Sequence, residues 1–195
     1  MKKKTEILKD GTRIIIRDLH SDDLDNLMKF YRSLPVKDRF YLKVDVTKRK
    51  VVRQRIGLTE TGNVFRIIAL HGNSIIADGA LELSREEWSK HQGELRVIVA
   101  GKFQRKGLGT IMLRELYFLA LKKNIEKIVA RIMKPQVAAQ SICRKLGFHQ
   151  ETIIPDYVKD QAGEPQDLVI MTSNIKNLWE ELEHFYSDSD WQRCR

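Results

Sequence analysis

The sequence is poor in cysteine and contains no long hydrophobic run. Its two cysteines, Cys143 and Cys194, lie far apart and form neither a metal-ligand spacing nor an evident disulfide framework. No apolar segment approaches the length of a membrane span, and the basic start, Met1 to Lys4, is not followed by the apolar core of a signal peptide. We therefore expect a cytoplasmic protein that has no membrane partner.

Metal-binding patterns and internal repeats are also missing. The five histidines are scattered and match neither an HExxH nor a C2H2 pattern, so we expect no metal site. No repeat or low-complexity linker divides the chain. A length of 195 residues suits one domain of ordinary size, and 42% of hydrophobic residues is enough for a real core.

Positive charge is present in excess. The chain has 35 Lys and Arg against 26 Asp and Glu, a net charge of +9, which favours polyanions such as nucleic acid, anionic lipid or a phosphorylated cofactor. The basic stretch from Lys48 to Arg55 keeps an RNA- or ribosome-associated protein open as an alternative. This stretch lacks interleaved aromatic residues and any nucleic-acid motif, so a solvated helix face is favoured and no nucleic-acid partner is expected.

The alternation of β-branched runs and amphipathic segments predicts an α+β fold. A hairpin is expected from strands at 64–70 and 75–83, which flank the turn at 71–74. Further strands are expected at 12–17, 94–99, 127–133, 148–153 and 167–173, and helices at 24–31, 107–122, 137–146 and 175–186, with a partly helical segment at 36–58. This order predicts one mixed, mostly antiparallel sheet flanked by helices, in a single domain of residues 1–174 that is followed by a C-terminal helix and tail, residues 175–195.

A glycine-containing loop joins the strand at 94–99 to the helix at 107–122. Helix starts carry unpaired N–H groups and a partial positive charge, so they bind phosphate well. The glycines of the loop, Gly107 and Gly109, allow close approach of the backbone, and Arg105 and Lys106 add charge for phosphate oxygens. The local chemistry therefore predicts an anion cradle, with phosphate as the expected ligand.

Two common phosphate-binding motifs do not fit this loop. The dinucleotide fingerprint GxGxxG fails because Met112 stands where the third glycine should be, and a Walker loop fails because no GK[ST] is present. What remains is QxxGxG between a strand and a helix. Here the chain resembles the GNAT superfamily of N-acetyltransferases, whose signature [Gln/Arg]-x-x-Gly-x-[Gly/Ala] is matched by Gln104, Gly107 and Gly109.

A second segment supports the same resemblance. Residues 139–148, AQSICRKLGF, are similar to the family's later segment N-x-x-A-x-x-L-Y-x-x-x-G-F. Ala139, Gly147 and Phe148 agree with that pattern, and Ile142 replaces the leucine. The resemblance covers about residues 12 to 173, which is most of the chain.

The resemblance implies a domain that binds acetyl-CoA and moves the acetyl group directly to a primary amine of a small molecule or protein. In that family, backbone N–H groups of the loop hold the pyrophosphate of coenzyme A, and the preceding strand receives the pantetheine arm and stabilises the oxyanion. The residues that take these roles by resemblance are Val97, Ile98, Val99, Gln104, Arg105, Lys106, Gly107, Leu108, Gly109 and Thr110. Gln136 stands where the family often has an asparagine that contacts the pantetheine.

Two positions carry the expected catalysis. Glu94 lies near where several family members place a carboxylate, so it is the first choice for the general base, with Glu82 as the other candidate. Cys143 stands where many members have the tyrosine that protonates the leaving thiolate. A thiol can donate that proton, but a small buried apolar residue is the favoured interpretation of Cys143, and Tyr157 is a further candidate for the acid.

The missing tyrosine supports an alternative in which the same fold binds acyl-CoA without catalysis, as a sensor or interaction module. The acceptor is not readable, because a fold does not fix its substrate. The basic balance favours acidic or neutral acceptors over polyamines, and Arg53, Trp88, Asp156 and Tyr157 are candidates to line an acceptor cleft. The sequence also leaves a homodimer open.

Overall fold

Eight strands form one mixed sheet in the computed structural model, which describes residues 3–160 and 162–175. Their order in the sheet is β1-β2-β3-β4-β5-β6-β8-β7, and every neighbouring pair is antiparallel except β5 and β6, which are parallel. In chain order the strands are β1 (Lys4–Ile7), β2 (Arg13–Asp18), β3 (Val64–His71), β4 (Ser74–Leu83), β5 (Gln92–Val99), β6 (Lys127–Met133), β7 (His149–Lys159) and β8 (Pro165–Asn174). The predicted α+β class and mostly antiparallel sheet are confirmed.

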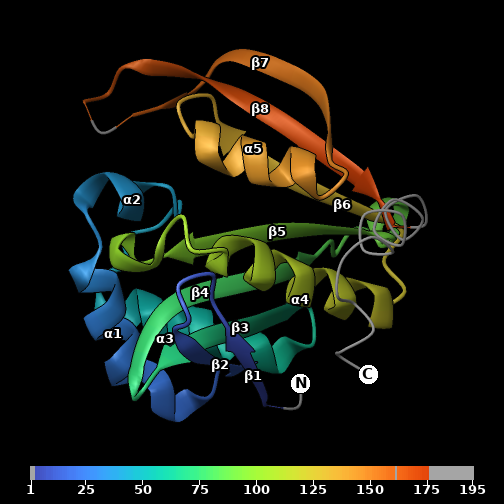
Figure 1. Ribbon diagram of the computed structural model, residues 1–195. Coiled ribbons are helices and arrows are strands. Elements are labelled where there is room, and N and C mark those ends of the chain that lie inside the picture. The colour runs from blue at the N-terminus through green and yellow to red at the C-terminus, as the bar shows by residue number, and fades with distance from the viewer. Residues whose placement is uncertain (1–2, 161, 176–195) are drawn as a thin grey trace.

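The described residues form five α-helices, four of which pack on the two faces of this sheet (Figure 1). They are α1 (Leu24–Ser33), α2 (Val36–Phe40), α3 (Arg49–Gly57), α4 (Leu108–Lys122) and α5 (Val137–Lys145). Residues of α4 and α5 share one buried cluster, and residues of α1 and α3 share another. No helix in the part of the chain that the structure describes is long and apolar enough to cross a membrane.

The two buried clusters follow from the periodicity of the sequence. Leu27 and Tyr31 of α1, four residues apart, face the sheet together, as helical spacing predicts. Ile67 and Ile68 are neighbours on β3, and strand alternation sends Ile67 to the cluster beneath α4 and Ile68 to the cluster beneath α1. The central strands are therefore buried on both faces, which explains their continuous apolar runs.

The basic stretch around α3 has one buried face. Val52 and Ile56 pack into the cluster beneath α1, and Arg55 is also buried. Lys50 and Arg53 are exposed. The packing of α3 on the sheet accounts for its apolar positions, and the exposed cations form the solvated face that the sequence suggests.

The predicted hairpin is confirmed, since β3 and β4 pair from Val64 opposite Glu82 to His71 opposite Ser74. Two strands differ from the prediction. β1 was not expected, because its four residues are mostly exposed at the sheet edge and show no apolar pattern. β7 continues past the expected end at 153 through Pro155, which an edge strand tolerates because the missing N–H breaks no necessary ladder bond.

The expected terminal helix and tail, residues 175–186 and 187–195, lie outside the described residues, except for Ile175. Ile175 is buried against the α4 side of the sheet, and its carbonyl accepts a hydrogen bond of 2.9 Å from the hydroxyl of Tyr117. The division of the chain into residues 1–174 and 175–195 stays a prediction.

Candidate functional site

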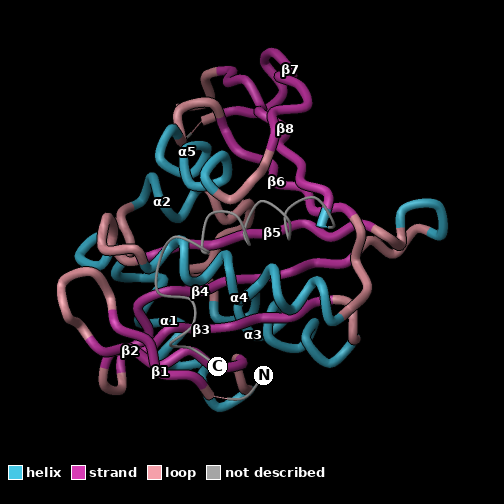
Figure 2. The backbone as a smooth tube through the Cα atoms, turned by 45° about the vertical axis from the view of Figure 1, so that its right-hand side comes forward, coloured by secondary structure: helices cyan, strands magenta, loops and turns pink. Residues whose placement is uncertain are grey.

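The sheet opens between its two parallel strands. β5 pairs with β6 only from Gln92 opposite Lys127 to Glu94 opposite Val129, after which the strands diverge. Both views show β6, β8 and β7 turning away from β5 on this side (Figures 1 and 2). The result is a wedge between the second half of β5 and the second half of β6.

The open edge of β5 presents backbone groups to the wedge. The N–H of Ala100, the residue after β5, donates to the carbonyl of Ile76 on β4 at 2.9 Å. Because backbone groups alternate along a strand, the N–H and C=O of Val97 and Val99 point the opposite way, into the wedge. The carbonyl of Val99 accepts a hydrogen bond from Nε2 of Gln104 at 3.1 Å, so Gln104 ties the end of β5 to the loop.

The loop after β5 reaches α4 through two left-handed residues. Arg105 has φ of 60°, and Gly107, the N-cap of α4, has φ of 89°. Glycine is the residue that adopts this conformation without strain. Gly109 lies against α5, since a Cβ there would stand 3.4 Å from Cδ1 of Ile142. The first N–H groups of this 15-residue helix lack intrahelical partners, as required for an anion cradle.

The turn between β1 and β2 packs against this cradle. Lys9 donates its backbone N–H to the carbonyl of Lys106 at 3.1 Å, and a Cβ at Gly107 would lie 3.5 Å from Cγ of Lys9. Lys106 turns toward the same hairpin, with Nζ 2.8 Å from Asp10, and its hydrogen bond is the main reason that the pKa of Asp10 falls to about 2.

Lys9 and Arg105 are consequently the cations beside the cradle that have no ion-pair partner within the described residues. Sequence reasoning missed Lys9, because the only local signal was a lysine in a turn before the first expected strand. The sequence predicted Lys106 to be a cation for phosphate. In the structure, Lys106 is paired with Asp10.

Most side chains of the strand and loop are engaged in packing. Leu108, the first residue of α4, is fully buried, and Val97 and Val99 pack partly into the same cluster. Ile98 packs on the opposite face, against the cluster beneath α1. The side chains are therefore taken up by packing, while Thr110 is half-buried in the first turn of α4.

A cleft of about 1040 Å³ lies between residues 36–47 and the strands β6, β7 and β8. Gln136, the N-cap of α5, lines it, and Oε1 of Gln136 accepts the N–H of Met133 at 2.9 Å. This bond leaves the amide NH2 of Gln136 as a donor for a ligand. Of the four residues expected to line an acceptor cleft, Tyr157 lines this one.

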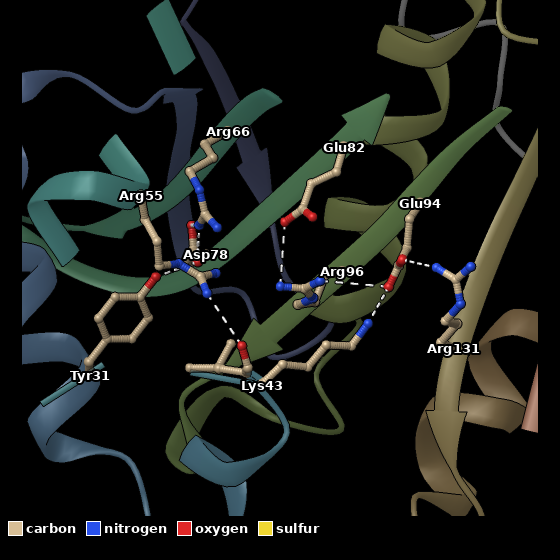
Figure 3. Close-up of polar contacts among 10 residues, drawn as sticks. Tyr31, Lys43, Arg55, Arg66, Asp78, Glu82, Glu94, Arg96 and Arg131 are labelled. Atoms are coloured by element: carbon tan, nitrogen blue, oxygen red, sulfur yellow. Dashed lines mark hydrogen bonds and ion pairs between the residues drawn. The ribbon is translucent and has the colours of Figure 1, made fainter. Parts of the chain in front are cut away.

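Glu94 stands where the wedge begins, and three cations surround it (Figure 3). Its carboxylate lies 2.5 Å from Nζ of Lys43, 3.6 Å from Arg96, and forms an ion pair with Arg131. Burial acts to raise the pKa of Glu94, but the hydrogen bond from Lys43 and the three positive charges outweigh burial, so the pKa is lowered. A carboxylate held in this way is a weak proton acceptor.

Glu82 lies opposite Glu94 across the β4–β5 ladder. Figure 3 shows Arg96 between the two carboxylates, with its guanidinium 3.4 Å from Glu82. Glu82 has this one ion pair, whereas Glu94 has three. The two candidate bases are thus neighbours, and Glu82 is the less constrained of them.

A buried polar network supports the wall of the cleft from beneath. Asp78 accepts hydrogen bonds from the hydroxyl of Tyr31 at 2.7 Å and from Nη1 of Arg66 at 2.7 and 2.9 Å. Arg55 lies beside this group and donates to the carbonyl of Leu42 at 3.3 Å (Figure 3). Since Leu42 precedes Lys43, Arg55 holds the segment whose next residue binds Glu94.

A family model described as "Acetyltransferase (GNAT) family" matches residues 24–148 of the chain. The chain belongs to this family. The resemblance inferred from the loop motif and from residues 139–148 is therefore confirmed. A search of curated proteins gives no match.

Several solved structures of GNAT proteins share the fold of this chain. The ribosomal-protein-alanine N-acetyltransferase from Brucella melitensis is 20% identical, with a TM-score of 0.72 over 82% of this chain and 98% of that one. The GNAT domain of S. lividans PAT is 14% identical, with a TM-score of 0.74 over 88% of this chain and 96% of that one. YncA from Salmonella typhimurium, whose structure contains its cofactor acetyl-CoA, is 16% identical, with a TM-score of 0.71 over 83% and 94%.

Cys143 of this GNAT chain lies in the buried cluster beneath α5 and is 4% exposed. It does not line the cleft. Burial raises the pKa of its thiol to about 11. The packing interpretation of Cys143 is favoured, because its thiol is buried in an apolar cluster and does not line the cleft.

We expect Cys143→Ala to leave kcat within about twofold of the original value, because the thiol would have only a packing role. Cys143→Ser should lower the free energy of unfolding by about 1–3 kcal/mol, since a hydroxyl would be buried among apolar side chains without a hydrogen-bond partner. Steady-state kinetics and urea unfolding measure the two effects. A large fall in kcat for Cys143→Ala at unchanged stability would restore the acid role.

Proposed function

We propose that this GNAT domain is an acetyl-CoA-dependent N-acetyltransferase that transfers acetyl to a primary amine. The observation that carries the proposal is the continuity of the wedge with the cradle: the open edge of β5 leads directly to the N-terminus of α4. The family supports acyl transfer, and the acetyl-CoA in the structure of YncA from Salmonella typhimurium supports the cofactor.

The pyrophosphate would lie against the N–H groups of residues 105–110, with the side chains of Lys9 and Arg105 beside it. The pantetheine arm would run along Val97–Val99, where the backbone groups of Val97 and Val99 face the wedge. The NH2 of Gln136 would donate to the pantetheine from the opposite wall. This placement makes the thioester meet the cleft near Glu94, where the two strands separate.

The amine attacks the thioester carbonyl directly, and a backbone N–H of Val97 or Val99 stabilises the oxyanion. Coenzyme A leaves as a thiolate and takes up a proton. Tyr41 and Tyr157 line the cleft with hydroxyl groups, so we propose a cleft tyrosine as the acid in place of Cys143. Much of the rate enhancement would come from holding amine and thioester together.

We propose that Glu94 acts as a positioning residue. It binds Lys43 of the α2–α3 segment and Arg131 of β6, so one carboxylate joins a wall of the cleft to both strands of the wedge. The amine proton would pass to water, with Glu82 as the nearby carboxylate that has a single ion pair.

Glu94→Gln is expected to lower kcat/KM by about 10- to 100-fold, because loosened cleft walls would misplace the amine. The acid limb of the pH–rate profile should remain, since the group that accepts the proton would still be present. Kinetics between pH 5.5 and 9 (roughly the range of enzyme stability) measure this. Glu87→Gln, which removes an exposed carboxylate, is the control. A fall in kcat of about 1000-fold or more at unchanged KM would instead make Glu94 the base.

Calorimetry with coenzyme A and acetyl transfer to a panel of amines test the proposed function together. Binding and turnover are expected. Coenzyme A binding without turnover on any amine would favour the alternative of a non-catalytic sensor or interaction module. Absence of coenzyme A binding would overturn the proposal.

A further inference from the structure

The cleft beside Glu94 is basic. Among the described residues, its one acidic lining residue, Asp45, already has hydrogen-bond and ion-pair partners. Asp45 accepts hydrogen bonds from the N–H and hydroxyl of Thr47, and Lys48 lies 3.5 Å away. Two of the lining cations, Lys43 and Arg131, are bound by Glu94. The cations that remain are Arg39 and Lys159, which have no ion-pair partner within the described residues.

Arg39 and Lys159 stand on opposite walls of the cleft. Arg39 belongs to α2 and Lys159 to the end of β7. A ligand anion between the walls would meet both cations. An anion on the outer surface would meet only one, so the arrangement favours a ligand that enters the cleft.

Apolar side chains line the same cleft and remain open to solvent. Val36 is 60% exposed, Phe40 39%, Val44 44% and Tyr157 64%. Large apolar side chains gathered in a concave surface are typical of a ligand site. The combination of apolar walls with unpaired cations indicates a ligand that has an apolar body and a negative charge.

The buried network adds positive charge beneath the cleft. Asp78 pairs with Arg66, whereas Arg55 has no ion pair within the described residues, and its Nε and Nη2 have no hydrogen-bond partner. Figure 3 shows Arg55 hydrogen-bonded to the segment that leads to Lys43. Uncompensated charge near a low-dielectric wall raises the local potential and concentrates anions.

The cleft also adjoins the wedge. Arg131, Met133 and Gln136 line the cleft, and they belong to β6 and the turn after it, which form one side of the wedge. A ligand in the cleft would therefore place an amine near a thioester bound along Val97–Val99.

We propose that the acceptor is an apolar α-amino acid, a primary amine that carries both a carboxylate and an apolar side chain. This inference rests on the proposed function. Arg39 and Lys159 bind the carboxylate, and Val36, Phe40 and Val44 contact the side chain. The ammonium group first loses a proton to solvent. A bond then forms between nitrogen and the acetyl carbonyl carbon, the C–S bond breaks, and the thiolate takes up a proton, which gives an N-acetyl amino acid and coenzyme A.

Matched acceptors test the charge requirement. Coenzyme A binding is first measured by calorimetry, and acetyl transfer is then compared for phenylalanine, phenylalanine amide, leucine, leucine amide and spermidine. We expect kcat/KM to be at least about tenfold higher for each acid than for its amide, as one charge-assisted contact allows. The amine of each amide is less basic than the amine of its acid, so more of it is in the reactive neutral form at neutral pH. A preference for the acid would therefore run against intrinsic reactivity and would identify a binding effect.

Arg39→Gln and Lys159→Gln should each raise KM for phenylalanine by about tenfold and leave KM for the amide unchanged. Lys37→Gln is the matched control, since it removes a charge from the same helix α2 outside the cleft lining. Equal transfer to acid and amide, or a preference for spermidine, would overturn the inference about the acceptor. In that case coenzyme A binding and turnover would still support the proposed function. Absence of coenzyme A binding, or of transfer to any amine, would instead overturn the proposed function.

Discussion

Gly107→Trp is expected to weaken coenzyme A binding by at least about 100-fold, because the cradle would lose two or more hydrogen bonds to charged phosphate. Gly107 has φ of 89°, which costs a residue with a Cβ about 1–2 kcal/mol. The indole would also cover the first N–H groups of α4 and press on Lys9, whose Cγ lies 3.5 Å from the position of a Cβ at Gly107.

Gly62→Trp is the control for this experiment. Gly62 has φ of 76°, so the backbone strain is similar, and a Cβ there meets nothing within 4 Å. Gly62 lies at the opposite end of the sheet from the loop after β5. It precedes Val64, which pairs with Glu82 at one end of β4, whereas Val99 pairs with Ala77 at the other end. Both variants should lose similar thermal stability, and only Gly107→Trp should lose affinity in calorimetry. Unchanged affinity in Gly107→Trp would refute the loop assignment.

Asp78→Ala should lower the free energy of unfolding by about 3–5 kcal/mol, the typical cost of breaking a buried ion pair. Arg66 and Asp78 are both buried, and their distance is 2.7 Å. Burial acts to lower the pKa of Arg66, but the charge of Asp78 outweighs burial and keeps the guanidinium charged. Without Asp78, the buried guanidinium of Arg66 would lose its carboxylate, and the hydroxyl of Tyr31 would lose its acceptor.

Urea unfolding measures this loss, and the midpoint of thermal unfolding should fall by roughly 2–4 °C for each kcal/mol. Tyr31→Phe is the matched control, because it removes only one hydrogen bond to the carboxylate and should cost about 1.5–3 kcal/mol. Arg66→Leu combined with Asp78→Leu should be less destabilised than the sum of the two single variants. A cost below about 1 kcal/mol for Asp78→Ala would show that the pair contributes little in solution.

Local patterns in the sequence predicted several elements well. The turn around Gly72 and the alternating residues on either side predicted the β3–β4 hairpin, and the apolar spacing from Leu108 to Ala120 predicted α4. These features are set by contacts between residues close in sequence. The motif from Gln104 to Gly109 is local in the same sense, and it sufficed to indicate the family.

Edge strands were predicted poorly, because they bury few side chains. β1 has no buried position, and neither has β7, whose Pro155 imitates the end of a strand. In both, pairing with a neighbouring strand decides the conformation, and an apolar alternation does not reveal that pairing.

The sequence by itself determined the order of the buried elements and the cradle motif, since periodicity and turn chemistry act over a few residues. The tertiary structure decided which contacts the site residues make. Glu94 meets Lys43 from 51 positions away and Arg131 from 37 positions away, so its low pKa depends on contacts that no local pattern contains. Lys9 reaches the cradle, and Cys143 is buried away from the cleft, for the same reason: non-local packing brings charges and apolar surfaces together only when the sheet is assembled.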